Sequence, residues 1–368
     1  MQSRPLLSEG FNPLLGEVPL ISTEMIEETH WHPVALAQDV AQQPLAATLL
    51  ERDLVLWRDG AGTVHAWADQ CPHRGARLSL GRVSGGRLEC AYHGWQFAPD
   101  GRCAQVPALP AFVPPASHCA RTYQACEKYG LIWVQIAPAI GNVSDAGSGI
   151  AEFAAEDNAD LRKLNCGPYD VATSAPRIVE NFLDMAHFGF VHEGSLGTRS
   201  ATAIDKYRVD ATAHGLMATQ CRAWQPQSSL QAAAATQVEY TYEVTAPFSA
   251  VLTKVPDEVS EKVAKKGEGG AGNHAPAYRE SVALFICPLA PERSRVWFRL
   301  AVADFESPDL KLREFQHAIF MQDKPVLESQ NPKLLPLDLR AELHSPADKA
   351  SSAYRRHLQQ LGITFGVC

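Results

Sequence analysis

Two short segments, each carrying one cysteine and one histidine, are the first residues in this sequence that could bind a metal. Cys71 and His73 form the first pair, and Cys90 and His93 form the second. Thiolate and imidazole are ligands that suit zinc, copper and iron. A zinc finger usually takes two cysteines from one loop and two histidines from another, and a zinc ribbon takes four cysteines. Here each segment supplies one residue of each kind.

This mixed arrangement favours a two-iron cluster held between the tips of two β-hairpins. One iron would take both thiolates and the other both imidazoles, which is the Rieske type of [2Fe-2S] centre. Imidazole is neutral where thiolate is anionic, so such a cluster accepts an electron more readily. Pro72, Gly75, Gly94 and Trp95 beside the ligands suit tight loops with an aromatic cover. A structural zinc site, or unrelated core cysteines and surface histidines, is the alternative.

The remaining cysteines are expected to be free thiols, because none of them has the spacing of metal ligands. The chain has nine cysteines, an odd number, and its first residues do not pair a basic start with an apolar core. We therefore expect a reducing, cytoplasmic location without disulfides. The cysteines outside the paired segments are Cys103, Cys119, Cys126, Cys166, Cys221, Cys287 and Cys368.

A second candidate metal site lies in "ENFLDMAHFGFVHEG", which contains Asp184, His187 and His192. The histidines are five residues apart, and on a regular helix they would point about 140° away from each other. Both can reach one metal only if the helix bulges or loosens between them. Gly189 lies there and permits such a change. A buried helix with two hydrogen-bonded histidines is the alternative.

A third ligand is expected from the helix predicted over residues 308–331, where Asp323 lies on an apolar stripe. A buried carboxylate without a partner is costly, so it should bind a metal or form a salt bridge. Glu328 lies on the polar face and ranks second, and Pro325 should distort the helix just after the acid. The apolar stripe comprises Leu312, Phe315, Ile319 and Val326. Two histidines and one carboxylate on one side of an iron leave positions open for O2.

With both motifs in this order, the chain resembles the catalytic (alpha) subunits of Rieske non-haem iron oxygenases over roughly residues 30–361. The resemblance depends on C-x-H-x16-C-x2-H, on N-F-x-D-x2-H-x4-H and on the acid in "MQDKPVLESQNP". The phrases "CPHRGARLSLG", "VPPAS" and "YRRHLQQLGITFGVC" are similar to small homotrimeric hydroxylases and demethylases. These include the phthalate and vanillate demethylase-like group and the saxitoxin-pathway hydroxylases.

The resemblance implies a role for each candidate residue. Asp184 matches an aspartate that links a mononuclear-iron histidine to a cluster histidine, here His93, of the neighbouring subunit in a head-to-tail homotrimer. Cys71 and Cys90 would bind one cluster iron, and His73 and His93 the other. The mononuclear Fe(II) would be held by His187, His192 and Asp323.

Strand and helix patterns divide the chain into an all-β part and a mixed part, and so predict an α+β protein. The expected units are an N-terminal arm at 1–29, a Rieske domain at 30–137 and a linker at 138–150. A catalytic domain follows at 151–368, with a mobile loop at 255–277. The resemblance implies that the catalytic domain is a helix-grip fold, in which helices close over an antiparallel sheet.

The expected activity is an O2-dependent oxidoreductase that hydroxylates a small aromatic or heterocyclic compound, including O- or N-demethylation, in aromatic catabolism. Electrons would come from NAD(P)H through a flavin- or ferredoxin-type reductase, with or without a separate ferredoxin. Ring cis-dihydroxylation is the runner-up, and a Rieske protein that only transfers electrons is a weaker alternative. Phe182, Phe188, Phe190 and the loop 255–277 are candidate neighbours of the iron.

The net charge and the lengths of the apolar runs argue against two further partners, nucleic acid and the membrane. The formal net charge is -8 and no block of basic residues occurs, which argues against nucleic acid. No run of 18 apolar residues occurs, so no membrane span is expected.

Overall fold

The computed structural model describes residues 25–137, 147–232, 234–257 and 280–368. Most of the predicted N-terminal arm, linker 138–150 and loop 255–277 therefore lie outside the described residues. The last residues of the predicted arm belong to the described part of the chain. Glu27 is buried, and its carboxylate accepts hydrogen bonds from the backbone N–H groups of Thr364 (2.5 Å) and Phe365 (2.7 Å). This part of the arm therefore packs against the C-terminal segment of the chain.

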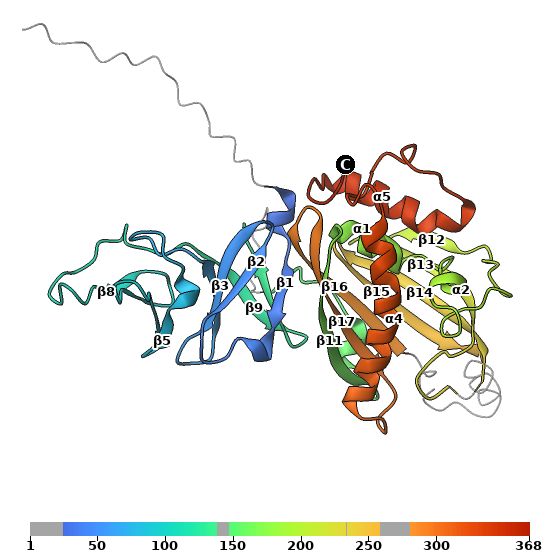
Figure 1. The fold of residues 1–368 in the computed structure, drawn as a ribbon, viewed down its shortest axis with the longest axis horizontal. Coiled ribbons are helices and arrows are strands. Elements are labelled where there is room, and N and C mark those ends of the chain that lie inside the picture. The colour runs from blue at the N-terminus through green and yellow to red at the C-terminus, as the bar shows by residue number, and fades with distance from the viewer. Residues whose placement is uncertain (1–24, 138–146, 233, 258–279) are drawn as a thin grey trace, which may run out of the picture.

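The N-terminal part consists of two antiparallel sheets, as the alternation of short strands and turns predicts (Figure 1). The six-stranded sheet has the order β1-β10-β9-β4-β3-β2, with His32–Leu36 (β1), Leu131–Gln135 (β10), Thr122–Lys128 (β9), Val64–Ala68 (β4), Arg52–Arg58 (β3) and Leu45–Leu49 (β2). The four-stranded sheet has the order β5-β6-β7-β8, with Arg82–Ser84 (β5), Arg87–Glu89 (β6), Gln96–Phe97 (β7) and Cys103–Gln105 (β8). Hairpins join β3 to β4 and β7 to β8.

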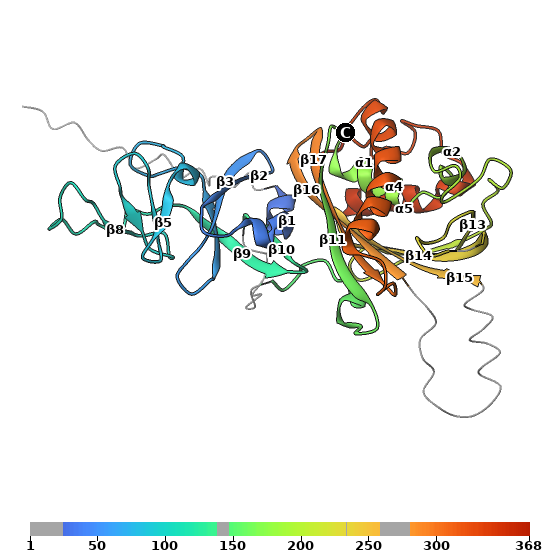
Figure 2. The same ribbon diagram turned by 60° about the horizontal axis from the view of Figure 1, so that its bottom comes forward.

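The C-terminal part is one seven-stranded antiparallel sheet with helices on one face (Figure 2). Its order is β11-β17-β16-β15-β14-β13-β12, with Arg162–Val171 (β11), Arg293–Val302 (β17), Glu280–Ala290 (β16), Ser249–Pro256 (β15), Thr236–Ala246 (β14), Leu216–Gln225 (β13) and Arg208–Ala211 (β12). The α-helices are Ala175–Phe182 (α1), Phe188–Val191 (α2), Asp309–Ser329 (α4) and Lys349–Leu361 (α5). Short 3-10 turns occupy Ile26–Thr29, Ala37–Asp39, Leu78–Leu80, Ala154–Asp157 and Pro346–Asp348. The predicted α+β architecture is thus confirmed.

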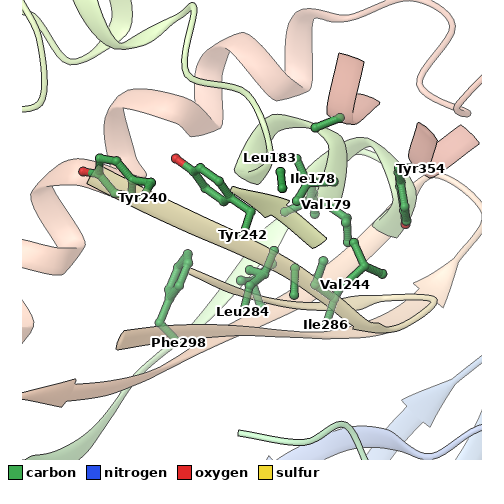
Figure 3. Packing of buried hydrophobic residues seen from close by; sticks show 14 of the residues in the cluster. Ile178, Val179, Leu183, Tyr240, Tyr242, Val244, Leu284, Ile286, Phe298 and Tyr354 are labelled. Carbon is green, nitrogen blue, oxygen red and sulfur yellow. The ribbon is translucent and has the colours of Figure 1, made fainter. Parts of the chain in front are cut away.

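Buried and partly exposed side chains alternate along strands of the seven-stranded sheet, as β14 shows. Along β14, every second side chain from Thr236 to Val244 is buried, and the residues between them are partly exposed. Tyr240 and Tyr242 therefore point from the sheet toward the helices, where α1 supplies Ile178 and Leu183 (Figure 3). An alternating strand of this kind buries one face and leaves the other toward solvent.

A second core joins the two parts of the molecule. The ring of Phe285 on β16 stacks on Tyr129 with centroids 5.6 Å apart, and it meets Trp133 of β10 edge-on at 5.0 Å. All three belong to one hydrophobic cluster that includes residues of β1, β3, β10, β16 and β17. The two parts are therefore held together by apolar packing, which makes their relative position rigid.

Helix α4 lies over the same face of the sheet as α1 and confirms the helix predicted over 308–331. Pro325 lies inside α4, and the helix continues past it to Ser329. Leu312 and Phe320 are buried, whereas Val326 is 46% exposed, so its predicted place on the buried stripe is wrong. After Asp323 the buried side chain of α4 is Leu327, which is 2% exposed. Among the described residues, each helix is too short or too polar to cross a bilayer.

Candidate metal centres

The two Cys/His segments form loops of the same geometry. In each loop the cysteine N–H donates to the carbonyl five positions later, at 2.8 Å for Cys71 and 2.9 Å for Cys90. The cysteine carbonyl accepts from a glycine N–H four positions later, at 2.9 Å for Gly75 and 3.0 Å for Gly94. Both glycines have positive φ, +72° and +68°, a conformation that glycine adopts without strain. The two loops therefore present equivalent Cys/His pairs from opposite sides.

The thiols lie inside and the imidazoles lie at the rim. Cys71 and Cys90 are each 2% exposed, and burial raises the pKa of the Cys71 thiol to about 11, with the Cys90 thiol adding to the shift. The rings of His73 and His93 are 4.6 Å apart, and Trp95 stacks on His73 at 4.3 Å. Two inner sulfurs and two outer nitrogens fit a [2Fe-2S] cluster of the Rieske type with its histidine side facing outward. The other cysteines among the described residues are free, as predicted.

The H-x4-H segment is not a bulged helix, which corrects the prediction. Helix α1 ends at Phe182, and the single turn α2 begins after His187 and ends before His192. The histidines therefore flank one short helix. His187 precedes the first residue of α2 and His192 follows its last residue, and the Nε2 atoms of the two rings lie 3.2 Å apart.

Gly189 is needed for space rather than for flexibility, which is a further correction. Its φ is not in the positive region, but an added Cβ would lie 2.8 Å from the Thr202 methyl group and 3.0 Å from the Thr198 carbonyl oxygen. Gly197 is tighter still. A Cβ there would lie 2.5 Å from the Phe188 carbonyl carbon, so this loop presses directly on α2.

His187, His192 and Asp323 converge on one point. The Asp323 Oδ1 atom lies 3.4 Å from His187 Nε2 and 3.2 Å from His192 Nε2. Three ligand atoms about 2.1 Å from a metal and at right angles to one another are roughly 3 Å apart. The triangle matches this geometry, so the three side chains can hold a metal on one side and leave the other side open.

Each of the three side chains is oriented by a neighbour. His187 Nδ1 donates to Asp184 Oδ2 at 2.9 Å, and His192 Nδ1 donates to Gln322 Oε1 at 2.8 Å. Both Nε2 atoms are thereby left unprotonated and directed at the centre. Asn181 Nδ2 donates to Asp323 Oδ1 at 3.1 Å. The sequence analysis assigns no role to Asn181, the first residue of the N-F-x-D-x2-H-x4-H motif, or to Gln322, which precedes Asp323, because an amide near a ligand is no signal by itself.

Asp184 lies on the far side of His187 from the centre. Burial alone raises the pKa of its carboxyl, but the hydrogen bond and charge of His187 and the N–H of Ala186 outweigh this, so the pKa lies below its ordinary value. Its side chain is 27% exposed and lines a surface groove with Val326 and Leu343. An ionised, partly exposed carboxylate thus connects the metal-binding side to the outer surface.

The open side of the triangle faces a cavity between α4 and the sheet. The cavity and its open mouth together enclose about 780 Å³. Phe182 and Phe188 line it, as predicted. Phe190 does not: it is 51% exposed and lies 5.2 Å beneath the Arg199 guanidinium, which corrects the prediction. The walls are mostly aromatic and aliphatic.

Two domain families match the chain. Residues 30–124 match the Rieske [2Fe-2S] domain, and residues 171–363 match the vanillate O-demethylase oxygenase C-terminal domain. The methylxanthine N1-demethylase NdmA of Pseudomonas putida is 30% identical over 340 residues, which cover 90% of this chain and 88% of that protein. The chain belongs to the Rieske non-haem iron oxygenases. It is a catalytic subunit, because it carries both domains.

This oxygenase is also similar, in sequence or in structure, to other proteins named as demethylases or monooxygenases. The probable methylxanthine N7-demethylase NdmC of Pseudomonas sp. (strain TJI-51) is 37% identical over 240 residues, 65% of this chain and 77% of that protein. The structure of P. putida CBB5 NdmA with caffeine superposes with a TM-score of 0.74 at 27% identity, covering 93% and 96% of the two chains. Dicamba monooxygenase shares the fold at 21% identity, with a TM-score of 0.72 over 92% of this chain and 98% of that one.

Family membership defines the cofactors and the general activity. The oxygenase uses a Rieske [2Fe-2S] cluster, a mononuclear non-haem iron and O2, and it oxidises a small organic substrate. Its electrons come from NAD(P)H through a reductase.

Proposed function

We propose that this oxygenase removes a methyl group from a nitrogen or oxygen atom of a small, flat aromatic or heteroaromatic compound. The observation that carries the proposal is a cavity that has the His187, His192 and Asp323 side chains at one end and apolar walls elsewhere. Such walls bind a flat apolar ring system and leave one edge at the metal-binding end. The names of NdmA and NdmC, which are N-demethylases, support the same reaction type.

The balanced reaction inserts one oxygen atom of O2 into a methyl C–H bond. The second oxygen atom leaves as water, with two protons and the two electrons that NAD(P)H supplies through the reductase. The product is a hemiaminal or hemiacetal, which breaks its C–N or C–O bond to release formaldehyde and leave N–H or O–H. The apolar walls exclude water from the reacting methyl group, and phenylalanines 182 and 188 hold the ring in place.

In this proposal, His187, His192 and Asp323 hold the mononuclear iron, whose role when bound is to activate O2 for attack on the C–H bond. Asp184 keeps His187 in the correct tautomer through the bond to Nδ1. Asn181 fixes the carboxylate of Asp323 through its amide. The four ligands proposed for the cluster are Cys71, His73, Cys90 and His93.

Formaldehyde release tests the reaction type. The loaded oxygenase, NAD(P)H and a generic reductase are incubated with a panel of N-methyl and O-methyl aromatic compounds, and formaldehyde is measured against O2 consumed. Demethylation predicts formaldehyde and demethylated product in equal amounts. A cis-diol without formaldehyde would instead establish ring dihydroxylation and remove the proposal.

We further propose that the working oxygenase is a head-to-tail homotrimer, in which Asp184 receives the electron from a cluster histidine, His93, of the neighbouring subunit. The groove that contains Asp184 is mostly polar and charged, but it also has two exposed apolar side chains, Val326 (46% exposed) and Leu343 (fully exposed). Beside His93, the Tyr92 ring is 60% exposed, and its centroid lies 3.8 Å from that of the imidazole. Exposed apolar side chains of this kind can pack together when a second copy of the chain binds.

Replacing Asp184 with Asn tests the bridge. Asp184→Asn keeps the shape of the side chain but removes its charge, so both metal sites should stay filled while product formation falls at least about 100-fold. Iron content and the visible spectrum report on the metals, and light scattering reports the trimer. Glu193→Gln, an exposed carboxylate nearby, is the control. Near-normal turnover of Asp184→Asn would remove the bridging role.

A further inference from the structure

The floor of the cavity has one polar row in an otherwise apolar sheet. Across neighbouring strands, Tyr242 pairs with Leu252, and Leu252 pairs with Val282, so this row is mainly apolar. The next row pairs Tyr240 of β14 with Lys254 of β15, and Lys254 with Glu280 of β16. Paired residues of an antiparallel sheet point to the same face, which here is the face toward α4.

Lys254 is a buried cation with two acceptors. Its Nζ lies 2.9 Å from Glu280 Oε2 and donates to the Ser228 carbonyl at 2.6 Å. The side chains of Lys254 and Glu280 are 13% and 5% exposed. An ammonium group has three N–H donors, and among the described residues only these two acceptors contact it. The third N–H of the ammonium therefore has no acceptor within the described part of the chain, and Lys254 lines the cavity, where another molecule can accept it.

The position of Lys254 is at the end of the cavity remote from the metal ligands. Lys254 and Gln316 line both the main cavity and a second cavity of about 460 Å³ that continues from it. Gln316 precedes Asp323 by seven residues on α4, which is roughly 10 Å along the helix axis at 1.5 Å per residue. Tyr240, in contrast, has its hydroxyl engaged by Gln225.

We propose that Lys254 is a specificity-determining residue that donates a hydrogen bond to a neutral acceptor, such as a ring carbonyl, at the end of the substrate opposite its methyl group. This rests on the proposed function, because it assigns the orientation in which a methyl group reaches the metal-binding end. A length of roughly 10 Å between the two polar ends suits a two-ring compound.

Glu280 makes the preference one for neutral rather than anionic substrates. The −1 charge of Glu280 lies 2.9 Å from the Lys254 ammonium, so this ammonium attracts a substrate carboxylate less strongly than an ammonium without an adjacent carboxylate would. The substrate carboxylate would also lie in the same apolar surroundings as the Glu280 carboxylate, where like charges repel strongly. A carbonyl oxygen accepts the N–H without carrying this cost.

Three two-ring probes with a methoxy group at one end test the assignment. They are 6-methoxyquinolin-2-one, which has a carbonyl at the far end, 2-methoxynaphthalene, which has no group there, and 6-methoxy-2-naphthoate, which has an anion there. Binding to the metal-loaded oxygenase is measured by titration calorimetry. Because removing Lys254 alone takes away the cation that lies 2.9 Å from the buried Glu280 carboxylate, the variant is Lys254→Met with Glu280→Gln.

The double variant should bind the quinolinone about 10- to 100-fold more weakly than the natural chain does, because it lacks one hydrogen bond from a charged donor. Its affinity for methoxynaphthalene should change less than about threefold on the same scale. Equal losses for both compounds, or no loss for the quinolinone, would overturn the proposal. Circular dichroism and iron content check that the variant folds. Since binding is measured without turnover, absence of demethylation by the natural chain would contradict the proposed function and leave this result standing.

Glu280→Gln alone provides the second arm. It keeps the Lys254 donor but leaves its charge unneutralised, so affinity for 6-methoxy-2-naphthoate should rise about tenfold or more while the quinolinone still binds. An unchanged affinity for the naphthoate would show that Glu280 does not set the charge preference.

Discussion

The surroundings of the Asp323 carboxylate indicate whether it binds a metal or forms a salt bridge. Its side chain is only 13% exposed, and a carboxylate that is this buried must be paired or bound. Two histidine Nε2 atoms and the amide of Asn181 surround it, all within 3.4 Å. Without a metal, three such polar groups offer each other only partial compensation. A metal ion therefore suits the site better than a salt bridge, which was the alternative.

Asp323→Ala should remove the mononuclear iron and abolish turnover, while the Rieske cluster stays intact. Metal analysis against the visible absorption of the cluster checks this outcome. The control is Glu328→Gln on the same helix, since Glu328 pairs with Lys324 and with the Ala172 N–H instead. If Asp323→Ala retains its full iron content, Asp323 is not a ligand.

Prediction at the residue scale depended on the type of signal. Cys71, His73, Cys90 and His93 were found from spacing, because short loops place near neighbours together. The position of Asp323 on an apolar stripe was found from helical periodicity. Gln322 could not be found this way, since its partner His192 is 130 residues distant in the chain.

At the scale of elements, the short helix α2 is positioned by the loop that packs on it. A Cβ on Gly197 would lie 2.5 Å from the Phe188 carbonyl carbon and 2.6 Å from the Gly189 nitrogen. These are backbone atoms, so α2 itself would have to move. The separation of His187 from His192 depends on this contact.

Gly197→Ala should therefore weaken mononuclear iron binding by about 10-fold or more, with the cluster unaffected. Competition with a chelator measures the iron affinity. Ser200→Ala, an exposed change in the same loop, is the matched control. Equal iron affinity in both variants would show that α2 tolerates the shift.

Helices α1 and α5 are joined by a charged network beside the groove. The side chains of Arg177 and Arg355 are 3% and 2% exposed, and both contact the Glu342 carboxylate. Burial on its own raises the pKa of Glu342, but the hydrogen bonds and charges of the two arginines outweigh it and lower the pKa to about 2. The network holds the loop that presents Leu343 to the groove.

Glu342→Gln should lower the free energy of unfolding at pH 7 by about 1.5–3 kcal/mol. The folded pKa lies below the unfolded value of 4.5, so this contribution is fully present above about pH 4.5 and is lost as the pH falls toward 2. Urea unfolding of both chains from pH 7 to pH 3.5 measures the difference, with exposed Glu306→Gln as control. A difference that grows on acidification would contradict this explanation.

At the scale of the whole molecule, the hydrophobic core shared by the N-terminal and C-terminal parts should make the two parts unfold as one unit. Phe285 belongs to the C-terminal part, but the aromatic rings that it contacts, Tyr129 and Trp133, belong to the N-terminal part. Two backbone bonds, from Leu50 N–H to the Pro288 carbonyl and from Glu51 N–H to the Leu289 carbonyl, add to the contact.

Phe285→Ala should cost about 3–5 kcal/mol, since Phe285 is completely buried. In the natural chain, loss of cluster absorption and loss of circular dichroism should follow one transition in denaturant. In the variant the cluster signal should be lost first. Phe305→Ala, a 60% exposed position, is the control. Separate transitions already in the natural chain would contradict a shared core.

Ligand spacing and strand alternation are local properties of the chain, so the sequence alone indicated a Rieske-type centre and the α+β fold class. The mononuclear iron and the electron donor followed from the resemblance to the Rieske oxygenases. Tertiary structure decided what depends on distant segments. It ended α1 at Phe182 so that His187 and His192 flank the separate turn α2, turned Val326 and Phe190 to solvent, and placed Lys254 in the cavity with Gln316. These outcomes follow from packing between α2, α4 and the sheet, and no local pattern encodes which segments meet. The choice of substrate is encoded at the same level, since the cavity is built from side chains of several strands and helices that are far apart in sequence.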